Sequence, residues 1–196
     1  EVEGEVILHQ VFDSAELKKL IGFLEEHGVE YYLESNQGLF ASANLRSCLI
    51  KLTLNGLAEN SVEGQEKINE IKWFLELLIE DPVRIDYEDV NKLSFVNHAI
   101  PYEIIHKKYN GDFHMLRSTV PAFGADSGEI GIKNINKKTA IEKLLAHIRQ
   151  GKEDCLAFGD GENDIPMFEA VATGIAMSNA SERLKAVADE ITYSSD

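Results

Sequence analysis

Apolar side chains recur at the spacing of an amphipathic helix in three segments of this 196-residue chain. These segments are residues 14–27, 65–78 and 137–148, and a proline opens a fourth predicted helix at residues 101–108. Asp13 or Ser14 is placed to cap the first helix, and Gly28 is placed to end it. Trp73 lies beside the apolar stripe of the second, where we expect it to pack partly buried.

Period-two alternation or a concentration of β-forming residues predicts strands elsewhere in the first two-thirds of the chain. The predicted strands are residues 5–11, 29–33, 47–54, 92–96, 113–119 and 129–132. In residues 47–54 every even position is apolar, although Leu49 breaks the alternation on the polar side. Asn55-Gly56 then gives a turn signal.

After residue 130 the rhythm changes to short strands that alternate with short helices, which indicates a parallel sheet. The expected strands are residues 153–158, 174–177 and 190–193, and the helices between them are residues 164–171 and 181–188. The apolar run Cys155–Phe158 suits a strand covered on both faces. We therefore predict an α/β protein of two domains, residues 1–130 and 131–196.

Charge and composition narrow the classes of function. Thirty-four acidic residues against 19 basic ones give a net charge of −15, which disfavours binding to nucleic acid and to anionic membrane surfaces. Two cysteines are too few for a disulfide framework, and neither a membrane-spanning apolar run nor a secretory leader is present, so we expect a cytoplasmic location. The first residue is Glu1, so we expect the chain to be processed or cut from something longer, and its oligomeric state stays open.

The stretch LAFGDGENDIPMFEA, residues 156–170, places carboxylates and an amide in a glycine-broken turn after a strand. Ligands of open α/β sheets bind at the carboxyl ends of strands, where Asp160, Glu162, Asn163 and Asp164 would cluster. Oxygen ligands without Cys or His suit a hard cation such as Mg²⁺. Asn163 or Asp164 can instead cap the following helix, and a plain turn is the simpler interpretation of these residues.

A longer stretch favours the metal-binding interpretation over the plain turn. The sequence resembles the last motif block of the haloacid dehalogenase (HAD) superfamily in two consecutive segments, GDGENDIPMFEA and GIAMSNASERLKAVADEIT. Within it, the match is to the Cof-type sugar-phosphate phosphatases. The resemblance implies part of a doubly wound, parallel, Rossmann-like core at residues 131–196, and an α/β cap with a largely antiparallel sheet at residues 1–130. It also implies Mg²⁺-dependent hydrolysis of a small phosphomonoester.

The resemblance also implies roles for individual residues. Asp160 would bind the metal, and Asp164 would complete or orient the metal site. Asn163 would contact phosphate. Glu162 falls at a free position of the family pattern, so we expect it to be solvated. Six histidines show no metal-ligand spacing, so zinc is not expected.

A second stretch, EIGIKNINKKTA from residue 129, resembles the family pattern E-I-x-x-x-G-V-x-K-G-x-A-L. The aligned lysine is Lys137, which in the family holds the transferring phosphate and so joins Asp160 and Asp164 as a catalytic residue. Asn134 stands where the family has glycine, and Lys138 stands where it has a second glycine. Lys138 therefore remains the alternative functional lysine, and a solvated basic turn is the simpler interpretation.

The family's nucleophile is the first aspartate of a D-x-D-G-T motif, which this sequence does not contain. Asp13 and Asp112 have the wrong context. The residues that support metal and phosphate would thus be present without the nucleophile, and we expect the chain alone to be inactive. Two alternatives stay open: a phosphomutase, which shares the core chemistry, and a non-catalytic fragment that binds a phosphorylated ligand.

Overall fold

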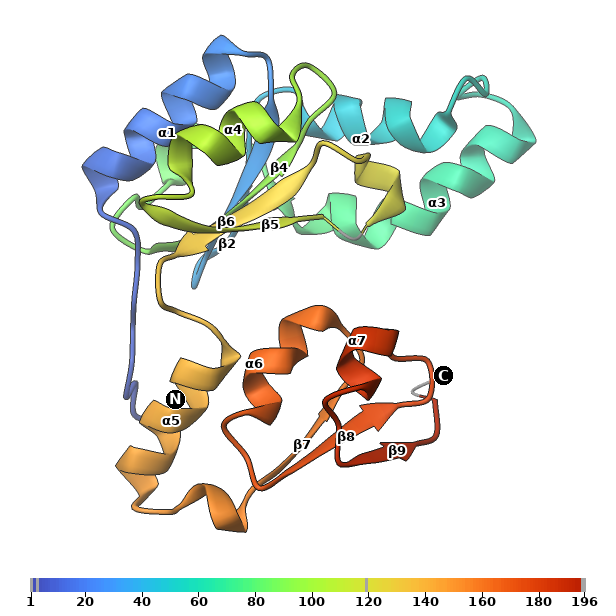
Figure 1. The fold of residues 1–196 in the computed structure, drawn as a ribbon. Coiled ribbons are helices and arrows are strands. Elements are labelled where there is room, and N and C mark those ends of the chain that lie inside the picture. Colours follow the sequence, from blue (N-terminus) through green and yellow to red (C-terminus); the bar gives the residue numbers. More distant parts are fainter. Residues whose placement is uncertain (1, 3, 119, 195–196) are drawn as a thin grey trace. The chain divides into compact units, whose positions relative to one another are not determined.

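The computed structural model describes residues 2, 4–118 and 120–194 of the chain. The chain divides into two compact units (Figure 1). The large unit is Gln10–Lys133, and the small unit comprises Glu1–His9 and Asn134–Asp196. The sequence-based division at residue 130 lies close to this boundary but places residues 1–9 with the first domain, whereas their contacts group them with the small unit.

The large unit contains four α-helices, six strands and two short 3₁₀ turns among its described residues. The helices are α1 (Ser14–Glu26), α2 (Leu45–Leu54), α3 (Val62–Leu77) and α4 (Tyr102–Tyr109). The strands are β1 (Glu30–Ser35), β2 (Gly38–Ala41), β3 (Leu78–Ile79), β4 (Val90–Val96), β5 (Phe113–Arg117) and β6 (Gly128–Ile132). The 3₁₀ turns are η1 (Pro82–Arg84) and η2 (Pro121–Phe123).

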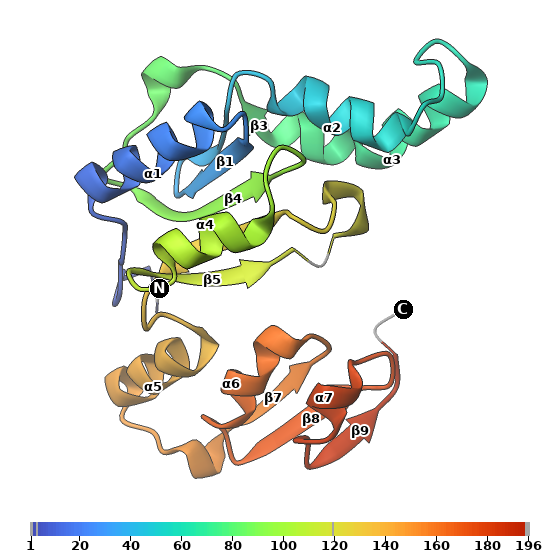
Figure 2. The same ribbon diagram turned by 45° about the horizontal axis from the view of Figure 1, so that its top comes forward.

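The strands of the large unit form one sheet in the order β3-β2-β1-β4-β6-β5. Neighbouring strands run antiparallel except for β2 and β3. Helices α1 and α4 lie on one face of this sheet (Figure 2), where they enclose the main apolar core with residues such as Leu17, Leu33, Phe95 and Ile105. Helices α2 and α3 pack on part of the other face, where Tyr32 belongs to a second and smaller core.

Most elements of the large unit agree with the sequence-based prediction. The Asp13 carboxylate accepts hydrogen bonds from the first turn of α1, and Gly28 takes a positive φ of 66° just after that helix. Strand β5 ends at Arg117, and residue 119 of the predicted strand lies outside the described residues.

Three predictions for the first 133 residues were wrong. Residues 47–54 belong to helix α2 and not to a strand, because Leu45 and Leu49, one helical turn apart, are both buried in the second core. Residues 5–11 pair with no neighbouring strand and form no strand themselves. Trp73 is 66% exposed rather than partly buried, because the apolar stripe of α3 turns Leu75 toward the sheet instead.

The small unit alternates helices with three parallel strands in the order β7-β8-β9. Its helices are α5 (Lys137–Ile148), α6 (Ile165–Phe168) and α7 (Glu182–Lys185). The strands are β7 (Leu156–Gly159), β8 (Thr173–Met177) and β9 (Glu190–Thr192), and the 3₁₀ turns are η3 (Lys152–Asp154) and η4 (Glu162–Asp164). The fold class is therefore α/β, as predicted, with a parallel sheet in one unit and a largely antiparallel sheet in the other.

One face of the small sheet is covered and the other is not. Ala157, Ala176, Phe168 and Leu184 lie in an apolar cluster between the strands and their helices. On the opposite side of β7, Leu156 and Phe158 are 60% and 55% exposed, so the prediction of a strand covered on both faces does not hold for this chain.

None of the helices formed by the described residues is long and apolar enough to cross a lipid bilayer.

Candidate functional site

Residues 160–164, which we call the acidic turn, follow directly from the carboxyl end of β7. They are organised around the buried carboxylate of Asp164. Only 3% of Asp164 is exposed. Its Oδ2 accepts hydrogen bonds from the backbone N–H groups of Asp160, at 3.0 Å, and Gly161, at 3.1 Å. The carbonyl of Asp160 in turn accepts a hydrogen bond from the N–H of Ser181 at 3.1 Å. Asp164 therefore holds the shape of the turn from inside rather than capping α6 with its side chain.

Space favours glycine at two positions beside the carboxylate of Asp164. A Cβ atom on Gly159 would lie 2.7 Å from the Cβ of Asp164, and one on Gly161 would lie 2.5 Å from Oδ1 of Asn163. Neither glycine has a positive φ. The two glycines thus allow the side chains of residues 163 and 164 to fold back over the backbone of the turn.

Lys137, the first residue of α5, reaches the same carboxylate from a second element. Its ammonium group donates a hydrogen bond to Oδ1 of Asp164 and forms an ion pair with it. A capping box fixes the start of α5: the Asn136 side chain accepts from the N–H of Thr139, and the Thr139 hydroxyl oxygen accepts from the N–H of Asn136. The side chain of Lys137 is 48% exposed, and an ammonium group has three N–H donors, of which Asp164 accepts one.

Lys138, the alternative lysine, points to a different partner. Its ammonium lies 2.8 Å from Oε2 of Glu169, and this exposed pair lies away from Asp164. Among the described residues, Lys137 and not Lys138 is therefore the lysine brought to the acidic turn.

The ionisation state of Asp164 follows from these contacts. Burial raises the pKa of this carboxyl, but the hydrogen bond from Lys137 and those from the backbone of Gly161 and Asp160 lower it further, so that the pKa lies below its ordinary value of 3.8. Asp164 is thus an anion at neutral pH, with both oxygens engaged.

The loop before α5 explains a departure from the family pattern. Asn134, which stands where the family has glycine, adopts a left-handed conformation with φ of 63°. Asparagine tolerates this region better than other residues that carry a side chain. The substitution therefore preserves the backbone turn that delivers Lys137 to the site.

The side chains of Asp160 and Asn163 are exposed in the turn and carry oxygens that could bind a cation. Glu162 is also exposed, and its carboxylate lies 2.7 Å from Nη1 of Arg183, a partner that the sequence did not suggest because 21 residues separate the two. Glu169 was missed for the same reason, since it pairs with a lysine 31 residues away.

The acidic turn offers few of the oxygen ligands that a hard cation needs. The described residues contain no group of three or more His, Cys, Asp or Glu that could hold a metal ion. Mg²⁺, however, is commonly held by one or two carboxylates together with waters and substrate phosphate. Asp160 can supply one such carboxylate, whereas both oxygens of Asp164 already accept hydrogen bonds. Asp160 would therefore supply one ligand of a metal ion, with waters and substrate oxygens as the others. Asp164 would support the turn without binding the ion.

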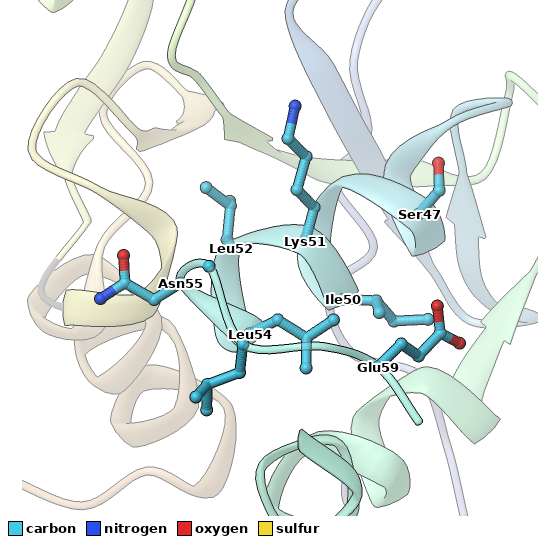
Figure 3. Close-up of a pocket in the computed structure, with 9 residues that line it drawn as sticks. Ser47, Ile50, Lys51, Leu52, Leu54, Asn55 and Glu59 are labelled. Atoms are coloured by element: carbon cyan, nitrogen blue, oxygen red, sulfur yellow. The ribbon is translucent and has the colours of Figure 1, made fainter. Parts of the chain in front are cut away.

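The large unit has an open hollow of about 710 Å³ beside α2 (Figure 3). Its polar lining includes Lys51, Asn55 and Glu59. In Figure 3 the side chains of these three residues point in different directions, so their polar ends do not converge on one position. A small-molecule site requires convergent polar groups, and this hollow does not provide them.

The fold and the turn together define a class of protein: an α/β protein with a lysine–carboxylate site at the carboxyl end of a parallel strand. The chain belongs to the haloacid dehalogenase-like hydrolase family, whose pattern matches residues 1–196. The resemblance inferred from GDGENDIPM and its neighbours is thereby confirmed.

Two curated proteins show how far the likeness extends. The phosphatase YwpJ of Bacillus subtilis is 26% identical over 207 residues, which cover 99% of this chain and 70% of YwpJ. The chloroplastic endoribonuclease YBEY of Arabidopsis thaliana is 32% identical over 108 residues, which cover 55% of this chain and 18% of that protein. The second match covers only a small part of the plant protein. The name of that protein therefore describes a chain that lies mostly outside the match.

A solved structure gives the same fold. The sugar phosphatase BT4131, of HAD subclass IIB, matches 98% of this chain with a TM-score of 0.64 and 20% sequence identity. This chain spans 66% of that structure, so a third of the solved chain has no counterpart in the 196 residues.

Proposed function

We propose that this chain belongs to a Mg²⁺-dependent phosphatase that hydrolyses a small phosphomonoester such as a sugar phosphate. One observation carries the proposal: Lys137 and Asp164, 27 residues apart in sequence, meet at the turn whose exposed carboxylate is Asp160. The names of the phosphatase YwpJ and the sugar phosphatase BT4131 support the same reaction class.

Each residue of the turn has a role in this proposal. Asp160 would hold the cation, which when bound neutralises charge on the phosphoryl oxygens. Lys137 would donate to a phosphoryl oxygen with the part of its ammonium that Asp164 leaves free, and Asn163 would bind the same group through its amide. Asp164 keeps Lys137 and the backbone of residues 160 and 161 in place, so it is a positioning residue in this account.

The nucleophile would lie outside these 196 residues. The reaction class proceeds through an aspartyl-phosphate: an aspartate oxygen attacks phosphorus as the ester oxygen leaves with a proton, and water then attacks phosphorus and releases phosphate. No D-x-D-G-T motif occurs in the chain. A non-catalytic fragment that binds a phosphorylated ligand is therefore the second candidate, and a phosphomutase is a variant that shares this chemistry.

We also propose roles for the two domains, a class of ligand and a cellular location. Residues 1–130 would act as the cap that selects the substrate, and residues 131–196 as the C-terminal part of the catalytic core. The net charge of −15 disfavours nucleic acid as the ligand. A small phosphorylated metabolite would need the local positive charge of a bound cation in so acidic a protein. We propose a cytoplasmic location on the low cysteine content alone.

The proposal can be tested on the 196-residue chain by NMR with Mn²⁺, which takes the same oxygen ligands as Mg²⁺ and broadens nearby signals. We expect Mn²⁺ to broaden the amide signals of Asp160 and Gly161 selectively, and Asp160→Asn to abolish the effect because an amide is a poorer ligand for a hard cation. Glu162→Gln is the matched control and should leave the broadening unchanged.

The two lysines are separated by adding inorganic phosphate in the presence of Mg²⁺. Lys137→Met should weaken phosphate binding by about tenfold, the usual worth of a charge-assisted hydrogen bond, while Lys138→Met should leave it unchanged. If Asp160→Asn has no effect on the cation, or if Lys138→Met is the more damaging change, the assignment of the site is wrong.

A further inference from the structure

One backbone hydrogen bond ties the acidic turn to the segment that follows a second strand of the small unit. Strands β7 and β8 are parallel neighbours, and Gly159 at the end of β7 pairs with Ala176 near the end of β8. The segments after the two strands therefore begin at the same edge of the sheet. The N–H of Ser181, which lies between β8 and α7, donates to the carbonyl oxygen of Asp160 at 3.1 Å.

Ser181 is held in place at the start of α7. Its hydroxyl oxygen accepts a hydrogen bond from the N–H of Leu184 at 3.3 Å, as an N-cap does. Leu184 and Ala180 are buried in the apolar cluster of the small unit, with 0% and 5% of their surfaces exposed. Residue 181 thus lies beside two anchored residues, and the packing of the core fixes the direction of its N–H.

Asp160 is constrained by a hydrogen bond on each side of its Cα atom. Its N–H donates to Oδ2 of the buried Asp164 at 3.0 Å, and its carbonyl oxygen accepts from Ser181. Both peptide groups that flank the residue are therefore held, although the residue itself is exposed. Little more than side-chain rotation is then lost when the carboxylate binds a ligand, which lowers the entropic cost of binding.

A second contact between the same two segments is weaker. The carboxylate of Glu162 lies 2.7 Å from Nη1 of Arg183, but the two side chains are 52% and 74% exposed. Exposed ion pairs of this kind contribute little to stability. The hydrogen bond from the N–H of Ser181 is therefore the contact that we expect to control the position of the acidic turn.

We propose that Ser181 is a positioning residue for Asp160, and that its backbone N–H raises the affinity of this carboxylate for a divalent cation. The inference rests on the proposed function, in which Asp160 binds Mg²⁺. Ser181 does not touch the cation in this account and acts through the carbonyl group of Asp160. Groups that orient a metal ligand change the affinity for the metal without binding it. By thermodynamic reciprocity, cation binding must strengthen the same hydrogen bond by the same factor.

Two variants of Ser181 separate its N–H from its hydroxyl. The φ of this residue is −60°, close to the angle of about −65° that proline requires. Ser181→Pro removes the N–H and should weaken Mg²⁺ binding by about threefold to tenfold, the usual worth of one hydrogen bond, in a titration followed by the amide signal of Gly161. Ser181→Ala keeps the N–H and loses only the hydroxyl, so it should change the affinity by about twofold or less.

Ser61→Pro is the matched control. Ser61 is the N-cap of α3 in the large unit: its N–H donates to the carbonyl oxygen of Ala58 at 3.0 Å, and its hydroxyl oxygen accepts from the N–H of Gly64. Its φ is −76°, so proline can again replace serine with little change of the backbone. This change removes the same two kinds of hydrogen bond as Ser181→Pro and should leave the affinity for Mg²⁺ unchanged.

Hydrogen exchange of the unaltered chain provides a test that depends on no variant. Saturating Mg²⁺ should slow exchange of the Ser181 amide by the same factor of about three to ten. The amide of Ala186, which donates to the carbonyl of Glu182 within α7, should slow by about twofold or less.

Three results would overturn the inference and leave the proposed function standing: no slowing at Ser181, equal slowing at Ser181 and Ala186, or undiminished affinity in a folded Ser181→Pro variant. The exchange measurement decides the question if Ser181→Pro does not fold. If Mg²⁺ does not shift the amide signal of Gly161 in the unaltered chain, the proposed function itself fails.

Discussion

At the scale of single residues, the ion pair of Lys137 and Asp164 is the contact on which the candidate site depends. The pKa of Asp164 is lower in the folded chain than its ordinary value of 3.8. Its contribution to stability is therefore present above about pH 3.8 and is lost as the pH falls through the folded value. Removing Lys137 reduces this contribution, because only the backbone N–H groups of Asp160 and Gly161 would then offset the free-energy cost of burying the carboxylate.

We predict that Lys137→Met destabilises the small unit by about 1–2 kcal/mol at pH 7, and that the difference from wild type shrinks as the pH falls below 3.8. Lys138→Met removes only an exposed pair with Glu169, and such pairs contribute little, so this variant should leave the stability of the small unit nearly unchanged. Hydrogen exchange at the amides of β8 measures this, because the single tryptophan, Trp73, lies in the large unit and does not report on the small one. An equal loss in the two variants would contradict the pairing.

The residues of this site could be predicted one by one, but their contacts could not. The motif string identified Asp160, Asn163 and Asp164, and the family pattern identified Lys137 with Lys138 as a rival. The partner of each lysine depends on how α5 packs beside the acidic turn, across 27 and 31 residues of sequence. The family pattern favoured Lys137, but only the structure shows which carboxylate each lysine contacts.

At the scale of elements, α2 shows where pattern reading fails. Residues 47–54 satisfy a period of two at their even positions, and the exception was Leu49. In the structure Leu49 is 3% exposed and packs with Leu45, which lies outside the window of alternation. Leu49, which interrupted the strand pattern, is the residue whose spacing from Leu45 indicates a helix. Strand β2 was missed because its four residues are too short to show a period and depend on pairing with β1.

Leu49→Ala should therefore destabilise the large unit by about 2–5 kcal/mol, the usual cost of truncating a buried leucine. Lys51→Ala, two residues away on the exposed side of α2, should change stability by less than about 0.5 kcal/mol. Urea unfolding followed by Trp73 fluorescence compares the two variants. A small effect of Leu49→Ala would mean that the helix does not bury this residue.

The uncovered face of β7 gives a second prediction at this scale. Leu156 and Phe158 are apolar and more than half exposed, and parallel sheets are normally covered on both faces. We expect the 196-residue chain to self-associate as its concentration rises, and the double change Leu156→Thr with Phe158→Thr to reduce this without loss of the strand. Val83→Thr, at an apolar position that is 90% exposed in the large unit, is the control for sedimentation velocity measurements. Association that is unchanged by the double variant would exclude this face as its cause.

At the scale of the whole molecule, the two units carry different parts of the proposed chemistry. The small unit brings Lys137, Asp160 and Asp164 to one turn, and the large unit is proposed to act as the cap that selects the substrate. Neither unit contains the D-x-D-G-T aspartate that would attack phosphorus. In the proposed function, the acidic turn would supply electrostatic support for phosphoryl transfer, and the group that forms the covalent intermediate would come from outside these 196 residues.

The most direct measurement of this account is turnover of a panel of phosphomonoesters by purified residues 1–196 with saturating Mg²⁺, beside the Bacillus subtilis phosphatase YwpJ under the same conditions. We predict turnover by YwpJ and none above background by the 196-residue chain, although that chain binds Mn²⁺ and phosphate at the acidic turn. Turnover by residues 1–196 comparable to that of YwpJ would contradict the account, because another aspartate of this chain would then have to serve as the nucleophile.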